Sequence, residues 1–140
     1  MPSRAFLDSN VFIFSFERTG SNWQRIVELL VTGGLRGVVT DRVVREVMRY
    51  FRKYHGKDLA AKFRELILLT SDFILEEELR VDGKLFELVG RRDASALAAV
   101  RSIGISHLVS TDSDFDVVPE HRTPRECLQG RGERARPGDE

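Results

Sequence analysis

Five acidic residues of the chain stand next to apolar segments instead of lying in polar runs. They are Asp8, Glu46, Asp93, Asp112 and Asp114. Carboxylates are costly to desolvate and repel one another unless a cation lies between them. If the fold gathers four or five of them, the simplest explanation is a bound divalent metal ion, which would be able to activate water.

The remaining reactive side chains favour a hard metal ion over zinc or a nucleophilic triad. Oxygen ligands prefer Mg²⁺ or Mn²⁺, and we expect one or two such ions in the site. The single cysteine, Cys127, excludes an internal disulfide and a cysteine-based zinc site. His55, His107 and His121 show no metal-site spacing, and neither a Ser-His-Asp nor a Cys-His arrangement finds support.

Two of the acids follow short apolar runs that we interpret as buried strands. Asp8 follows residues 5–7, and Asp112 follows residues 107–110. Ligands of open parallel sheets bind beyond the carboxyl ends of the strands, which is where both side chains would then lie. Each aspartate alone is also a common turn or cap residue, so the prediction depends on their combination.

Two further aspartates have a second explanation as helix caps. Asp93 opens an alanine-rich helix over residues 93–103, where an acid also stabilises the first turn through capping and the helix dipole. Asp114 follows Asp112 by two positions, and either could be a cap, whereas metal binding explains both.

Glu46 lies on the apolar face of an expected helix, where a solvent-facing glutamate would not be placed. It shares that face with Val43 and Tyr50, at offsets of three and four. The alternative is an edge glutamate paired with Arg42 or Arg49.

Strand and helix signals alternate along the chain. Apolar runs typical of strands cover residues 5–7, 38–39, 73–75, 107–110 and 117–118. Helical spacing covers residues 22–30, 43–54, 58–69, 77–89 and 93–103. The connections are too long for hairpins, so we predict a three-layer α/β/α sandwich with a mostly parallel central sheet.

Length and composition fit a single globular domain. The chain has 140 residues, of which 41% are hydrophobic. We expect one domain over residues 1–128 and a disordered tail over residues 129–140. No apolar run approaches the roughly 20 residues that span a bilayer, and the first residues reach a charge too early for a signal peptide. We therefore expect a cytoplasmic protein without membrane contact.

The formal net charge is zero, but the charged side chains are unevenly distributed. Residues 41–57 hold six basic side chains and two acidic ones, and residues 72–87 hold six acidic and two basic ones. A basic edge beside an acidic pocket suits a polyanion that approaches a metal site. The same asymmetry occurs on ordinary solvated helices, so both interpretations stay open.

The acids and the residues that flank them together resemble the motifs of PIN-domain ribonucleases. The matching strings are residues 6–11 (FLDSNV), Glu46 on its apolar helix, residues 93–98 (DASALA) and residues 108–115 (LVSTDSDF). Their order and intervals fit over roughly residues 4–118, and the last string is the most distinctive. The chain looks most like the small single-domain members, many of which are VapC-type toxins of toxin–antitoxin pairs.

The resemblance implies roles for individual residues. The family's catalytic, metal-binding acids match Asp8, Glu46, Asp93 and Asp112, and a further acid whose contribution varies matches Asp114. The small polar residues that orient the carboxylates match Ser9, Asn10 and Ser110. The arginines that we expect to guide the RNA backbone are Arg42, Arg45, Arg49, Arg91 and Arg92.

The resemblance also implies a Mg²⁺- or Mn²⁺-dependent endoribonuclease. Water would attack the phosphodiester in line, without a covalent intermediate, and leave a 5′-phosphate and a 3′-hydroxyl. The implied partners are RNA, a small antitoxin that covers the acidic pocket, and a second copy of the chain. Trp23, Phe63 and Phe86 are candidates for such a homodimer interface, although a place in the core is the simpler expectation for each.

Three other functions stay open on the sequence. A PIN-fold nuclease of RNA processing would need no antitoxin. A phosphatase with Asp8 as nucleophile would normally carry a second aspartate where this chain has Asn10. A non-catalytic module that binds RNA or a protein partner would keep the fold, but the intact set of acids argues against it.

Overall fold

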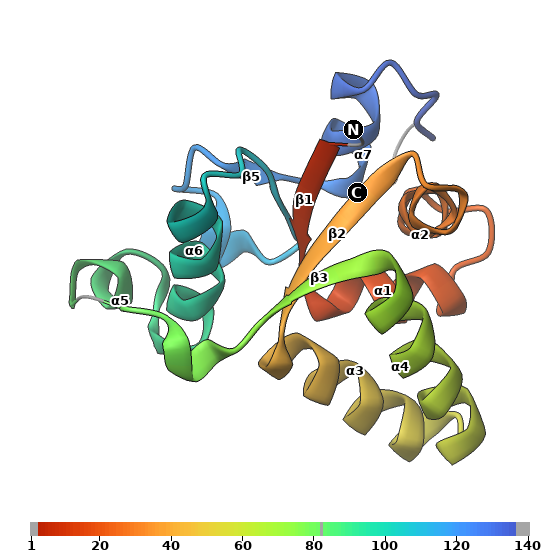
Figure 1. Ribbon diagram of the computed structural model, residues 1–140. Coiled ribbons are helices and arrows are strands. Elements are labelled where there is room, and N and C mark those ends of the chain that lie inside the picture. The colour runs from red at the N-terminus through yellow and green to blue at the C-terminus, as the bar shows by residue number, and fades with distance from the viewer. Residues whose placement is uncertain (1–2, 82, 137–140) are drawn as a thin grey trace.

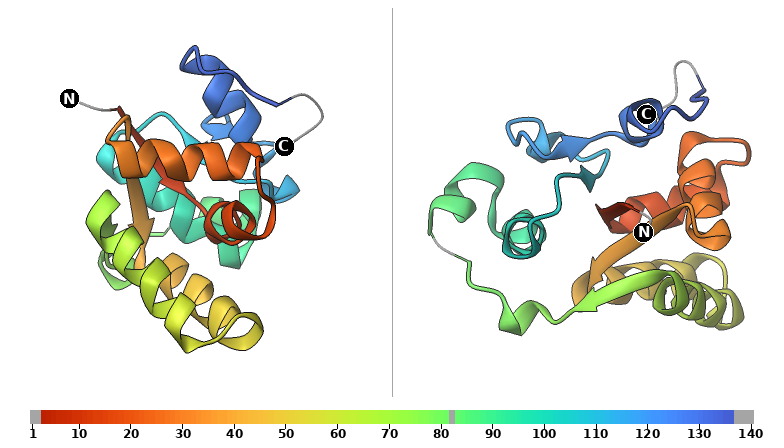
Figure 2. Two further views of the ribbon diagram at one scale, coloured as in Figure 1. Left: turned by 90° about the vertical axis from the view of Figure 1, so that its right-hand side faces the viewer. Right: turned by 45° about the horizontal axis from the view of Figure 1, so that its top comes forward.

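The computed structural model of the protein describes residues 3–81 and 83–136, and a five-stranded parallel sheet forms its centre (Figure 1). The strands are β1 (Ser3–Leu7), β2 (Leu35–Thr40), β3 (Ser71–Ile74), β4 (Leu108–Val109) and β5 (His121–Arg122). The helices are α1 (Ser9–Glu17), α2 (Asn22–Thr32), α3 (Asp41–Tyr54), α4 (Lys57–Thr70), α5 (Gly83–Val89), α6 (Arg91–Ile103) and α7 (Pro124–Gly130), with 3₁₀ turns η1 (Glu76–Glu78) and η2 (Ser113–Phe115). Helices α1 to α4 lie on one side of the sheet and α5 and α6 on the other, which confirms the predicted three-layer fold (Figure 1, Figure 2).

The strand order, β3-β2-β1-β4-β5, changes direction at β1. The chain adds β2 and β3 on one side of β1 and then crosses over to add β4 and β5 on the other. Leu7 of β1 pairs with Val109 of β4, so the residues that follow these two positions leave the sheet side by side. Ligands of parallel α/β sheets bind at such a switch in strand order, beyond the carboxyl ends of the strands.

The core consists of the apolar segments that the sequence predicted to be buried. Leu7 and Val109 are fully buried in the middle of the sheet. The small side chains of Ala94 and Ala99 on α6 are also fully buried, which lets this helix pack closely against its neighbours. Helix α3 directs its predicted apolar face into the core with Val43, Val44, Val47 and Phe51.

The start of α3 is fixed by two side chains at the carboxyl end of β2. The hydroxyl of Thr40 accepts a hydrogen bond from the backbone N–H of Val43 at 3.4 Å and caps the helix. Asp41 accepts a hydrogen bond from the backbone N–H of Glu76 at 2.7 Å. The first turn of α3 is therefore tied both to the end of its own strand and to η1, which follows β3.

Two elements predicted from the sequence lie elsewhere. The strand predicted over residues 117–118 is wrong, because the last strand is β5 and pairs with β4. Val118 is buried in the segment before β5, whereas Val117 is 63% exposed. Only Val118 of this apolar pair therefore belongs to the core, and neither residue forms a strand. The helix predicted over residues 77–89 begins only at Gly83, since Asp41 and Arg42 of α3 bind Glu76 and hold η1 apart from α5.

The C-terminal helix α7 packs beside α2 (Figure 2). Beyond α7, the backbone N–H of Arg136 donates to Asn22 Oδ1 at 2.8 Å, and Arg25 forms an ion pair with Glu133 at 3.0 Å. Residues 137–140 lie outside the described residues, and the expected division of the chain at residue 128 stays a prediction. Within the described helices, none is long and apolar enough to cross a membrane.

Candidate functional site

Asp8 stands where β1 ends and α1 begins. Its backbone N–H donates to the carbonyl of Val109 at 3.1 Å, which continues the pairing of β1 with β4 by one residue. Its side chain caps α1, because Oδ1 accepts a hydrogen bond from the backbone N–H of Ser9 at 2.8 Å. The carboxylate is therefore held at the carboxyl edge of the sheet, as predicted from its position after a strand.

Ser110 connects Asp8 to the segment that follows β4. Its hydroxyl donates to Asp8 Oδ2 at 2.8 Å and accepts a hydrogen bond from the backbone N–H of Asp112 at 3.0 Å. The side chain is fully buried, and the Ser110 carbonyl lies 2.8 Å from His121 Nε2 of β5. Both oxygens of the Asp8 carboxylate thus accept hydrogen bonds, one from each neighbouring segment, which fixes its orientation.

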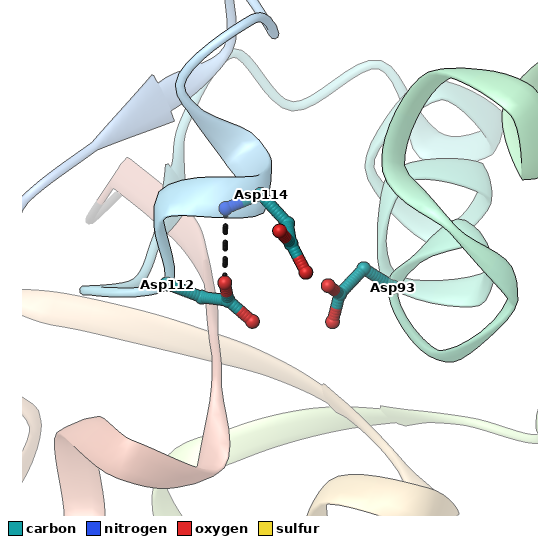
Figure 3. Close-up of side chains that lie close together, drawn as sticks. All are labelled: Asp93, Asp112 and Asp114. Atoms are coloured by element: carbon teal, nitrogen blue, oxygen red, sulfur yellow. Dashed lines mark hydrogen bonds between the residues drawn. The ribbon is translucent and has the colours of Figure 1, made fainter.

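Three carboxylates come together beyond β4 (Figure 3). Asp112 Oδ1 accepts a hydrogen bond from the backbone N–H of Asp114 at 2.9 Å, and its second oxygen points toward Asp93. One oxygen of each of Asp93, Asp112 and Asp114 lies within 4.8 Å of the others. Asp93 is 6% exposed in the first turn of α6, where the helix dipole favours a negative charge.

Glu46, on α3, lies near the aspartates at the ends of β1 and β4. Together with Asp8 and Asp112 it lines a cavity of about 370 Å³, and it is half-buried. Ser9 Oγ donates to Glu46 Oε2 at 3.2 Å, so the residue after Asp8 orients this carboxylate as well. Arg42, one of the two arginines considered as an alternative partner, forms an ion pair with Glu76 at 3.1 Å.

The chemistry of this donor set fits a hard divalent cation. Asp112 belongs both to the cavity lining, with Asp8 and Glu46, and to the three-carboxylate group, so the two sets of acids adjoin at this residue. Close carboxylates need a cation between them, and their oxygens suit Mg²⁺ or Mn²⁺. Among the described residues, buried Asn10 Oδ1 has no hydrogen-bond partner, and Asn10 lines the same cavity. Such an orphan acceptor is the kind of group that a hydrated cation would satisfy.

Apart from Arg49, the sequence did not single out the residues of the other wall of the cavity. This wall consists of residues of α3 one and two turns beyond Glu46, namely Arg49, Tyr50, Lys53 and Tyr54. The signal was present in the offsets from Glu46, which place all four on its side of the helix.

Tyr50 is fixed by a hydrogen bond, since its hydroxyl donates to Glu17 Oε2 at 2.7 Å. The same oxygen lies 2.9 Å from His55 Nε2. Burial alone would raise the pKa of Glu17, but the hydrogen bonds from His55 and Tyr50 outweigh it and lower that pKa below its ordinary value. The hydrogen bond to Glu17 is also the main cause that raises the pKa of Tyr50.

The arginines predicted to guide RNA occupy different surroundings. Arg49 lines the acidic cavity. Arg42 is paired with Glu76, and Arg45 forms an ion pair with Asp41 at 2.7 Å. The side chains of Arg91 and Arg92 lie outside the part of the chain that the structure describes. For all five arginines the RNA contact stays a prediction.

Fold and site together define a class of protein: a parallel α/β domain with a carboxylate cluster at the switch point of its sheet. No protein-family model and no curated protein sequence matches the chain. Several solved structures do match the chain over most of its length.

The chain is similar to three solved toxin or toxin–antitoxin structures. A chain of a toxin–antitoxin complex from Klebsiella pneumoniae aligns with TM-score 0.62 and 20% identity, over 87% of this chain and 98% of that one. A chain of VapBC2 from Rickettsia felis, bound to a promoter DNA fragment, aligns with TM-score 0.60 and 15% identity, over 86% and 98%. VapC20 from Mycobacterium tuberculosis, a sarcin–ricin loop cleaving toxin, aligns with TM-score 0.54 and 20% identity, over 81% and 93%. The chain therefore has the fold of the VapC-type PIN proteins, which confirms the predicted resemblance at the level of the fold.

Proposed function

We propose that the protein is a metal-dependent endoribonuclease and the toxin of a toxin–antitoxin pair. One observation carries the proposal: acids from distant parts of the chain form two adjoining sets, which share Asp112, at the switch point of the sheet. The likeness to a sarcin–ricin loop cleaving toxin supports RNA as the substrate. The likeness to a chain of a toxin–antitoxin complex supports an antitoxin as partner.

The residues that would hold the metal are the three acids that line the cavity and the two that lie close to Asp112. We assign Asp8, Glu46, Asp93 and Asp112 as ligands and catalytic acids, with Asp114 as a further ligand, for one or two Mg²⁺ or Mn²⁺ ions. When bound, such an ion neutralises phosphate charge and lowers the pKa of water in phosphodiester hydrolysis.

The chain's own residues prepare the site for this reaction. Ser9 and Ser110 hold the carboxylates of Glu46 and Asp8 in fixed orientations. Arg49 and Lys53 bring positive charge to the cavity wall, where it attracts the RNA backbone. The described lining of the cavity contains neither histidine nor cysteine, which leaves carboxylates, lysine, tyrosine and solvent for proton transfer there.

The proposal is tested by cleavage of a single-stranded RNA in Mg²⁺ or Mn²⁺. We expect Asp8→Asn to lower the cleavage rate by at least about 100-fold, more than the 10- to 100-fold typical of residues that only orient a ligand. Chelation of the metal should abolish cleavage by the wild type. The experiment compares rates under single-turnover conditions, with circular dichroism to confirm that both proteins are folded.

A matched substitution separates this effect from the loss of any surface charge. Asp58, an exposed acid in the first turn of α4, provides it, and Asp58→Asn should cut RNA like the wild type. Equal cleavage by the wild type and Asp8→Asn would sink the nuclease assignment. Phosphoryl transfer to Asp8, detected after incubation with a labelled phosphate ester, would favour the phosphatase alternative instead.

The partner proposals need separate tests. An open reading frame for a small protein next to the gene would support a toxin, and its absence would favour an RNA-processing nuclease. For the proposed homodimer, the structure shows which of the three candidate side chains is exposed and could contact a second copy of the chain. Trp23 is 1% exposed and Phe63 is half-buried, which leaves Phe86, 39% exposed, as the accessible one. Sedimentation of the wild type and Phe86→Glu would show whether a dimer exists and uses α5.

A further inference from the structure

One face of α3 combines an acid, two cations and two aromatic rings. Glu46, Arg49, Tyr50, Lys53 and Tyr54 all line the acidic cavity, and their offsets of three and four place them on the same side of the helix. The helical rise puts Tyr50 about 6 Å and Tyr54 about 12 Å along the axis from Glu46. The rings therefore lie beside the acids and outside the space that a metal would occupy.

The two rings differ in how firmly they are held. Tyr50 is half-buried and its hydroxyl is bonded to Glu17, which in turn contacts His55 just beyond the end of α3. Tyr54 is 58% exposed, and its ring centroid lies 4.7 Å from that of Tyr50 at an angle of 47°. Tyr50 thus gives the exposed ring a fixed neighbour, which limits the freedom that Tyr54 would lose on binding a ligand.

Positive charge accompanies the exposed ring. Lys53 Nζ lies 5.1 Å from the ring centroid of Tyr54, and Arg49 precedes Lys53 by one helical turn on the cavity wall. Proteins bind unpaired nucleotides with this combination, in which cations hold the backbone phosphates and aromatic faces stack on the bases. Bases in a duplex are already stacked on each other and cannot use such a ring.

We propose that Tyr54, supported by Tyr50, is a stacking site for the base of an unpaired nucleotide next to the scissile phosphate. Arg49 and Lys53 hold the backbone on either side of that nucleotide. The site gives the protein a preference for single-stranded over double-stranded RNA. This inference rests on the proposed ribonuclease function and adds a specificity-determining residue to it.

Binding without cleavage tests the stacking site. A fluorescent single-stranded RNA of twelve nucleotides is titrated with protein in Ca²⁺ and in chelator, and its anisotropy gives the dissociation constant. Tyr54→Ala should weaken binding by roughly 5- to 150-fold, the range for loss of one stacked base. Tyr54→Phe keeps the ring and should bind like the wild type. Phe73→Ala, which removes an exposed aromatic ring of β3 outside the described cavity lining, should also bind like the wild type.

A series of RNAs with a single abasic position gives a second readout. One position near the cleaved bond should weaken wild-type binding as much as Tyr54→Ala does, and should add nothing in the Tyr54→Ala protein, because the same contact is lost twice. Wild-type affinity of Tyr54→Ala, combined with normal cleavage in Mg²⁺, would overturn the stacking site and leave the nuclease standing. Absence of both cleavage and RNA binding in the wild type would overturn the proposed function, and the stacking site with it.

Discussion

At the scale of single residues, the hydroxyl of Ser110 links two acids that follow different strands. A serine hydroxyl has one proton to donate and lone pairs to accept with. Here the proton goes to Asp8 and a lone pair accepts the backbone N–H of Asp112. Because Ser110 is fully buried, solvent does not replace either hydrogen bond when one partner is lost.

Substitution of Ser110 by alanine should therefore affect both activity and stability. We expect cleavage to fall about 10- to 100-fold, since Asp8 loses a contact that orients it. The free energy of unfolding should fall by about 1–3 kcal/mol, because the N–H of Asp112 loses its acceptor. RNA cleavage at several Mg²⁺ concentrations and urea unfolding measure the two effects. Ser102→Ala is the control, because that serine is exposed on α6 and should leave cleavage unchanged. Full cleavage by Ser110→Ala would show that other contacts hold Asp8.

The sequence predicted the positions of some residues of the candidate site and not those of others, for a physical reason. Asp8 and Asp112 could be placed because both follow strands, and strand ends of a parallel sheet meet at one edge. The position of Glu46 on α3 followed from its spacing, but its contact with Ser9 did not, because helical periodicity says nothing about what faces the helix. Tyr54 falls on the apolar side of α3 by spacing, whereas the structure leaves it 58% exposed beyond the edge of the core.

At the scale of elements, α3 carries one wall of the cavity, so whatever holds its first turn also positions Glu46. Asp41 accepts hydrogen bonds from the backbone N–H of Glu76 and from Arg45. Burial alone would raise the pKa of Asp41, but these two hydrogen bonds outweigh it and lower that pKa. A carboxylate whose pKa is lowered by folding stabilises the folded state while it is ionised.

Asp41→Asn should lower the free energy of unfolding at neutral pH by about 1–2 kcal/mol, which is typical of a charged hydrogen bond at a helix start. The folded pKa is lower than the unfolded one, so this stabilisation is complete above the unfolded pKa and is lost as the pH falls through the folded pKa. The wild type and the variant should therefore become more alike in acid. Urea unfolding across this pH range measures the difference, with Asp58→Asn as the control. A difference that stays constant with pH would contradict an electrostatic role.

Long elements were predictable and short ones were not. The spacing of apolar residues identified α2, α3, α4 and α6, because each presents a continuous stripe to the core over several turns. β5 has only two residues and no apolar pattern, and its place depends on where the chain after β4 returns to the sheet. η1 interrupts a helical pattern because α3 binds Glu76. Both cases depend on contacts between distant segments, which local sequence does not contain.

At the scale of the whole molecule, a chain of zero net charge separates its charges in space. The acids gather at the switch point of the sheet, and Arg49 and Lys53 stand on the adjoining wall. Under the proposed function, this separation of charge would attract a phosphate backbone at the wall and a cation at the acids, although the zero net charge of the whole molecule favours neither. Of the basic segment over residues 41–57, Arg49 and Lys53 therefore bring positive charge to the cavity wall. Arg42 and Arg45 form ion pairs instead.

The segment after α7 connects the end of the chain to the starts of β1, β2 and α2, and its removal tests how much these contacts stabilise the fold. Arg131 is bonded to Ser3 Oγ and to the carbonyl of Gly34, and Arg136 is bonded to Asn22. A chain that ends at residue 130 should lose about 1–2 kcal/mol of stability, because the carbonyl of Gly34 and the buried side chain of Asn22 lose partners. For a protein of this size, that loss lowers the melting temperature by about 2–8 °C. RNA cleavage should persist, since no described residue after 130 lines the acidic cavity. A chain that ends at residue 136 is the control and should melt like the full chain. Equal melting of all three would contradict these contacts and support the disordered tail that the composition of residues 129–140 predicts.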